Sequence, residues 1–185
     1  MTIAIETRKI TLAEFLEMPD DDHAEYELVK GEVVEMPKGS VSGRHGRVLV
    51  KVGRFLDEYA SKNDLGTVYG EAGCTFQADD ENYLRPDLAF VAKGRTPDDF
   101  DGPIPVAPDL VVEINSPGDT TERIYNKIEA YQQAGVRIIW SIYLMGKFVL
   151  IYRLNDPDIK LLNLKDDFEG EDVLPGFKLA VKTLF

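Results

Sequence analysis

The stretch APDLVVEINSP, residues 107–117, decides the fold, because it combines a strand with one acid inside it. Residues 109–115 are rich in β-branched side chains, which favours a strand. Side chains alternate between the two faces of a strand, so Glu113 shares a face with Val111 and Asn115. A carboxylate among apolar neighbours is costly unless it is paired or bound to a metal. These residues therefore predict a strand that carries a functional acid.

A second acid, Asp87, follows Pro86 in a predicted strand over 84–92. If the two strands are neighbours, Asp87 and Glu113 lie side by side, and two oxygen donors suit Mg²⁺. Either acid alone could instead pair with an arginine or cap a strand end. Asp109 also follows a proline, but four residues of strand place it roughly 13 Å from Glu113. We therefore expect Asp109 only to start its strand.

Lys127 lies in a predicted helix over 120–134, which follows the Glu113 strand after a turn at 116–119. Its spacing from Ile124, Ile128 and Tyr131 places it in the core-facing stripe, where an unpaired ammonium is expensive. The alternative is a lysine whose head group returns to water. We expect Lys127 to reach the two carboxylates, where it could orient a metal-bound water or accept its proton. We also expect Lys127→Met to fold with little loss of stability.

A longer amphipathic helix is predicted over 42–62, with His45 in its apolar stripe. A basic stripe runs beside it, and a helix N-terminus already favours anions. We predict that His45 points into the site and that phosphates are contacted from this stripe, by Arg44, Arg47 and Lys51. The alternatives are a structural histidine and an exposed charged helix face.

The other predicted elements complete a mixed sheet covered by helices. The order of helix, three strands, helix and two strands is typical of this architecture. We expect a single domain over residues 1–185. The further predicted elements are a short helix with a capping box from Thr11, a hairpin over 26–36, a strand over 67–77, a hairpin over 137–154 and two or three short strands over 158–185.

Composition excludes several classes of protein. The formal net charge is −12, from 21 basic and 33 acidic residues, which argues against coating nucleic acid by bulk electrostatics. One cysteine, Cys74, allows no internal disulfide and fits a reducing cytoplasm. We expect no signal peptide and no membrane span. Glycine-rich phosphate loops and the ligand spacing of a zinc site are both absent from the sequence.

The chain resembles the PD-(D/E)XK nuclease superfamily and, within it, the Uma-type family of restriction endonuclease-like proteins. The resemblance covers nearly the whole chain and is carried by YELVKGEVV (26–34), SGRH (42–45), RPD (85–87), APDLVVEINSP (107–117), KIEAY (127–131), GV (135–136) and LPGF (174–177), in this order. It implies an αβββαβ core of the restriction endonuclease type, with an extra N-terminal hairpin and C-terminal strands. It also implies hydrolysis of phosphodiester bonds with Mg²⁺, or Mn²⁺.

The resemblance assigns the metal to Asp87 and Glu113. The simplest superfamily motif has a lysine two residues after the acid, where this chain has Asn115, so Lys127 is taken as the relocated lysine. The third acid stays open between Glu27, Glu32 and Glu71.

These observations predict a cytoplasmic, Mg²⁺-dependent DNA endonuclease. The predicted catalytic residues are Asp87, Glu113, Lys127 and His45. Because two strands must be cut, a homodimer is expected. Two alternatives remain: an interaction module for nucleic acid or protein on a degenerate nuclease fold, and a hydrolase of small phosphoesters. The target sequence and the choice between DNA and RNA cannot be read from the chain.

Overall fold

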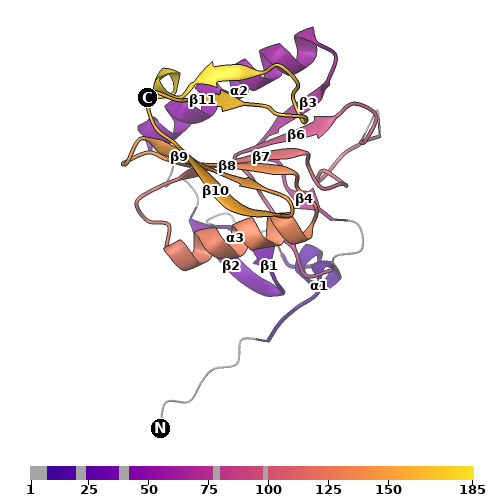
Figure 1. Cartoon of the computed structure of the whole chain (residues 1–185). Helices are drawn as coiled ribbons and strands as arrows, with labels where there is room; N and C mark the ends of the chain where they lie inside the picture. The colour runs from indigo at the N-terminus through magenta and orange to yellow at the C-terminus, as the bar shows by residue number, and fades with distance from the viewer. Residues whose placement is uncertain (1–7, 20–23, 38–41, 77–79, 98–99) are drawn as a thin grey trace.

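A central sheet of six strands separates the two long helices (Figure 1). The structure is a computed structural model that describes residues 8–19, 24–37, 42–76, 80–97 and 100–185. Helix α2 (Gly43–Lys62) covers one face of the sheet and α3 (Thr121–Gln133) covers the other. The strand order is β10-β9-β8-β7-β6-β3. The strands are β3 (Gly66–Gly70), β6 (Leu88–Ala92), β7 (Leu110–Asn115), β8 (Ile138–Tyr143), β9 (Phe148–Arg153) and β10 (Asp156–Leu162).

The sheet is mixed, as the sequence predicted. Strands β7 and β8 are parallel and are joined by α3, because parallel neighbours need a crossover connection. The other neighbours pair antiparallel. The chain order α2-β3-β6-β7-α3-β8 confirms the predicted αβββαβ core.

A second sheet of four strands packs on the α3 side of the molecule. Its order is β2-β1-β5-β4, and it contains the predicted N-terminal hairpin. Core residues of this sheet, including Val29, Cys74 and Leu84, share a cluster with Ile128 and Tyr131 of α3. The strands are β1 (Ala24–Val29), β2 (Glu32–Pro37), β4 (Cys74–Thr75) and β5 (Tyr83–Leu84).

Two predicted strands are each divided between the two sheets, which corrects the sequence reading. The strand expected over 67–77 becomes β3 and β4, and the backbone turns at Glu71, whose φ is 50°. The strand expected over 84–92 becomes β5 and β6. Pro86 has no N–H for a strand ladder, and the N–H of Arg85 donates to the Glu27 carboxylate instead. Asp87 consequently lies just before β6 and not inside a strand.

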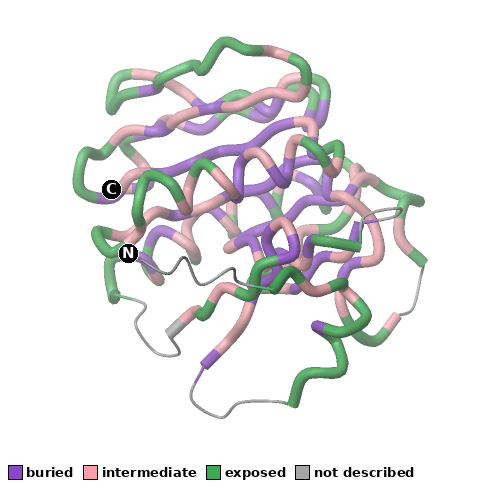
Figure 2. The backbone as a smooth tube through the Cα atoms, turned by 90° about the horizontal axis from the view of Figure 1, so that it is seen from below, coloured by how far each residue is buried: buried purple, intermediate pink, exposed green. Residues whose placement is uncertain are grey.

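The C-terminal segment covers the α2 side of the central sheet. It contains β11 (Asp167–Glu169), β12 (Lys178–Ala180) and the 3₁₀ helix η1 (Val181–Thr183). Phe168 and Phe177 pack on Trp140 in the larger core cluster. Figure 2 shows buried residues concentrated along the middle of the molecule and exposed ones on its turns.

Local signals set the helix boundaries. Thr11 and Glu14 form the predicted capping box of α1 (Leu12–Leu16). Helix α3 is capped by Thr120, whose hydroxyl accepts from the N–H of Arg123, while the Asp119 carboxylate accepts from the N–H of Ser116 in the preceding turn. Within the described residues, no helix combines the length and apolar character needed to cross a membrane.

Candidate active site

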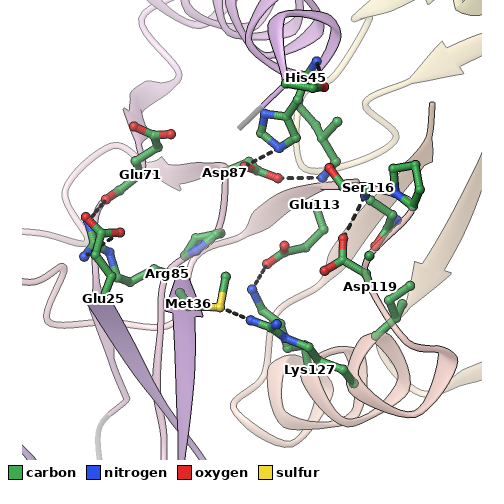
Figure 3. A pocket seen from close by; sticks show the side chains of 18 of the residues that line it. Glu25, Met36, His45, Glu71, Arg85, Asp87, Glu113, Ser116, Asp119 and Lys127 are labelled. Atoms are coloured by element: carbon green, nitrogen blue, oxygen red, sulfur yellow. Dashed lines mark hydrogen bonds and ion pairs between the residues drawn. The ribbon is translucent and has the colours of Figure 1, made fainter. Parts of the chain in front are cut away.

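A pocket of about 680 Å³ opens where β7 ends, between the first turns of α2 and α3 (Figure 3). The predicted residues His45, Asp87, Glu113 and Lys127 all line it. The register pairs Leu88 with Val112, so Asp87 lies across from Glu113 on the adjacent strand. Other charged or polar lining residues are Glu25, Ser42, Glu71, Arg85, Asn115, Ser116, Asp119 and Arg123.

Asp87 is held by a backbone amide and by His45. Its Oδ2 accepts from the N–H of Ile114 at 2.6 Å, and its Oδ1 lies 3.1 Å from Nε2 of His45. The hydrogen bond that His45 donates to the Asp87 carboxylate raises the pKa of His45 above its usual value, although burial opposes this. The buried Nδ1 of His45 has no hydrogen-bond partner among the described residues. His45 thus lines the pocket with its Nε2 directed at Asp87.

Glu113 is anchored through one oxygen. The Tyr131 hydroxyl donates to Oε1 at 2.6 Å, and Nζ of Lys127 lies 2.9 Å from the same atom. Both contacts involve Oε1, none involves Oε2 among the described residues, and the Glu113 side chain is 13% exposed. Burial raises the pKa of Glu113 above its usual range; Lys127 opposes this, while Asp87 and Glu27 add to it. Oε2 is thus the carboxylate atom with capacity for a further ligand.

Lys127 bridges two carboxylates from different sheets. Its Nζ lies 3.0 Å from Oε1 of Glu27 on β1, besides its contact with Glu113 on β7. Burial lowers the pKa of Lys127, but Glu113 and Glu27 outweigh that effect and raise it. The lysine is therefore held as an ammonium ion and does not return to water.

The buried Glu27 changes one expectation. Its side chain is 0% exposed, and its Oε1 also accepts from the N–H of Arg85 at 2.8 Å. Its Oε2 has no partner among the residues that the structure describes. Removing the lysine would leave this carboxylate without a cation. We therefore expect Lys127→Met to lose stability, in contrast to the small loss expected from the sequence.

The three candidates for a third acid lie in different places. Glu27 contacts Lys127, and Glu71 lines the pocket. Glu32 is exposed on β2 and is not part of the pocket lining. Asp109 is buried at the start of β7, paired with Arg95 and Arg137, as expected for a residue that only starts the strand.

The donor set fits a hard divalent cation bound mainly by water. Asp87 and Glu113 are opposed carboxylates on one pocket wall, and Mg²⁺ takes one or two carboxylates while it keeps several waters. Across the described ranges, no group of three or more His, Cys, Asp or Glu side chains is arranged to hold a metal ion. A metal here would thus depend on these two acids.

The predicted basic residues lie on another side of α2. Arg44 and Arg47 line a second hollow, of about 450 Å³, together with Lys147 from the β8–β9 turn. Lys51 donates from Nζ to the backbone carbonyl oxygens of Thr183, at 2.7 Å, and Leu184, at 3.3 Å. In this structure Lys51 thus ties α2 to the C-terminal segment.

Two residues of α3 that contact or line the site were not predicted from the sequence as site residues. Tyr131 was assigned to the apolar face, yet its hydroxyl binds Glu113, and a buried tyrosine usually needs such a partner. Arg123 lines the pocket one turn before Lys127. Helical spacing could have indicated it, because residues four apart lie on the same face.

Comparisons with known proteins identify a family and a shared fold. The profile of a family named Uma2, described as "Putative restriction endonuclease", matches residues 12–182. Among solved structures, a "putative nuclease belonging to DUF820" from Anabaena variabilis ATCC 29413 superposes with a TM-score of 0.82 at 22% sequence identity. The match covers 95% of this chain and 97% of that one, which shows a shared fold. The search of curated proteins gave no match.

Proposed function

The chain belongs to the Uma2 family, described as putative restriction endonucleases, and from this premise we propose that it is a metal-dependent endonuclease that hydrolyses phosphodiester bonds of DNA. One observation carries the proposal beyond family membership. Two opposed carboxylates, Asp87 and Glu113, line one pocket together with a buried ammonium, Lys127. This combination suits a reaction that places a metal and a cation next to a phosphate.

Asp87 and Glu113 would hold Mg²⁺ or Mn²⁺. When bound, such an ion polarises a phosphate oxygen and lowers the pKa of a coordinated water. Tyr131 and Lys127 both engage Oε1 of Glu113, which leaves Oε2 for the metal. The Ile114 amide and His45 fix the orientation of Asp87.

Lys127 would act as a fixed positive charge and not as a proton acceptor. The carboxylates of Glu27 and Glu113 hold it in the ammonium form. Two of its three N–H donors face Glu27 and Glu113, and the third can orient an attacking water while the positive charge stabilises negative charge that develops on the phosphate. His45 supports the site by positioning Asp87.

Nucleic acid would be held by local positive charge, since the protein as a whole is acidic. Arg44 and Arg47 stay the proposed phosphate contacts, with Lys147 in the same hollow. For Lys51, a phosphate contact would compete with its bonds to the C-terminal carbonyl groups. A homodimer would supply one site for each strand of a duplex.

Cleavage assays on plasmid, single-stranded DNA and RNA with Mg²⁺ or Mn²⁺ test this proposal. Asp87→Asn should reduce DNA cleavage by about a hundredfold or more and should abolish the calorimetric heat of metal binding. Asp57→Asn, at an exposed position of α2, is the matched control and should change neither. Metal-independent nucleic-acid binding without cleavage would instead indicate an interaction module. Turnover restricted to bis(p-nitrophenyl) phosphate would indicate a hydrolase of small phosphoesters.

A further inference from the structure

Arg123 is a pocket residue whose guanidinium group has no acidic partner in the described part of the chain. Six other arginines each pair with a carboxylate: Arg8, Arg54, Arg85, Arg95, Arg137 and Arg153. Among the described residues, the only hydrogen-bond partner of the Arg123 guanidinium is the sulfur of Met36, which carries the dashed line in Figure 3. A thioether is a weak acceptor, so it satisfies little of the guanidinium's capacity to donate.

The pocket-lining acids nearest to Arg123 in sequence already have hydrogen-bond partners. Asp119 accepts from the N–H of Ser116 at 2.7 Å. Glu113 is bonded to Lys127 and Tyr131. Because Arg123 is only half-buried and lines the pocket, its donors are available to a ligand that enters from solvent. A guanidinium matches the geometry of a phosphate and can bind it through two parallel hydrogen bonds.

The position of Arg123 indicates which phosphate it would meet. It lies four residues before Lys127 on α3, a separation of about 6 Å along the helix axis. Both side chains line the same pocket. Anions bound at Arg123 and at Lys127 would therefore lie at two successive positions along the helix. Neighbouring phosphates of a nucleic-acid strand are likewise separated along the strand, so the two side chains could contact two successive phosphates.

We propose that Arg123 binds the backbone phosphate next to the one that is cleaved, and so positions the strand in the pocket. This inference rests on the proposed nuclease function. Arg123 acts here as a positioning residue, because it holds the substrate away from the reacting atoms. The contact needs a polymer with successive phosphates and does not depend on base sequence.

Binding measurements without cleavage test the inference directly. Fluorescence anisotropy with a labelled DNA duplex, in EDTA and over a salt series, compares the wild type with Arg123→Met, Arg123→Lys and Arg137→Met. The Arg137→Met control removes the same charge at the start of β8, where Arg137 pairs with Asp109 and Asp172. Circular dichroism verifies that each variant is folded.

Arg123→Met should raise the Kd about tenfold, the scale of one charge-assisted hydrogen bond. It should also reduce the slope of log K against log salt by roughly 0.9, the value for one phosphate contact on duplex DNA. Arg123→Lys should keep the slope but lose part of the affinity, since the two parallel bonds are lost. In cleavage assays, Arg123→Met should raise KM more than it lowers kcat.

The outcomes separate this inference from the proposed function. If the wild type binds and cleaves DNA but Arg123→Met matches Arg137→Met in affinity and slope, the inference is wrong and the nuclease proposal stands. If the wild type binds without cleaving, the slope still decides the role of Arg123, and the nuclease proposal fails. If the wild type does not bind nucleic acid, both are overturned.

Discussion

Replacing Lys127 by methionine removes the buried ammonium that Glu27 and Glu113 share. The variant leaves Glu27 with a fully buried side chain and no cation, while Glu113 keeps its bond from Tyr131. Breaking a buried ion pair by removing one partner costs about 3–5 kcal/mol. For a chain of this size, each kcal/mol lowers Tm by about 2–4 °C, so Tm should fall by about 10 °C.

A second substitution tests the cause of this loss. In the double variant Glu27→Gln with Lys127→Met, the amide oxygen can still accept from the N–H of Arg85, but no buried negative charge remains. We expect the double variant to recover about 2 kcal/mol or more of the loss, because buried charge without a partner is the main cost. Nuclease activity should stay lost in both variants.

The assay is urea denaturation followed by tryptophan fluorescence. Trp140 is the only tryptophan and is fully buried in the core, so its emission reports unfolding. Lys160→Met, at an exposed lysine of β10, is the control and should change stability by less than about 0.5 kcal/mol. A loss below about 1 kcal/mol in Lys127→Met, or a double variant as unstable as the single one, would refute this account of the buried network.

Three further predictions concern residues around the site. In the metal-free protein, the raised pKa of His45 means that its pairing with Asp87 stabilises the fold fully below about pH 6.5. This contribution is lost as pH rises through the pKa of His45 in the folded state. NMR titration should place the His45 midpoint above 6.5, and a lower midpoint would contradict this. Tyr131→Phe removes a hydrogen bond to a buried carboxylate, so it should lower the free energy of unfolding in urea by about 1–2 kcal/mol. It should also weaken Mg²⁺ binding in calorimetry. Unchanged values would mean that the hydroxyl is dispensable. Lys51→Met should lower the free energy of unfolding by about 1 kcal/mol, because the C-terminal carbonyl groups lose their donor. Arg47→Glu should instead weaken DNA binding and lower its salt slope, with stability unchanged. The reverse pattern would assign the phosphate contact to Lys51.

Much of the core could be predicted because its signals are local. The apolar spacing over 42–62 matches α2, and the inward position of Lys127 follows from helical periodicity. Neighbouring strands then bring Asp87 opposite Glu113. Each of these inferences uses residues within one element or within two consecutive strands.

The division of two predicted strands between the sheets could not be found in this way. The N–H of Arg85 leaves the strand ladder because a carboxylate 58 residues earlier, Glu27, accepts it. No local pattern near either residue shows that contact. For the same reason Glu27 stayed one of three equivalent acids in the sequence, although in the structure it is the second partner of Lys127.

Two backbone amides at the pocket are hydrogen-bonded to side-chain carboxylates, so the local opening of both sheets depends on pocket side chains. Glu27 accepts the N–H of Arg85 between β5 and β6, and Asp87 accepts the N–H of Ile114 within β7. Both amides therefore depend on side-chain carboxyl groups for protection from solvent exchange, unlike the amides bonded to carbonyl groups in the same strands. Hydrogen exchange at Arg85 and Ile114 consequently reports whether the Glu27 and Asp87 side chains are in place, without a substrate or a label.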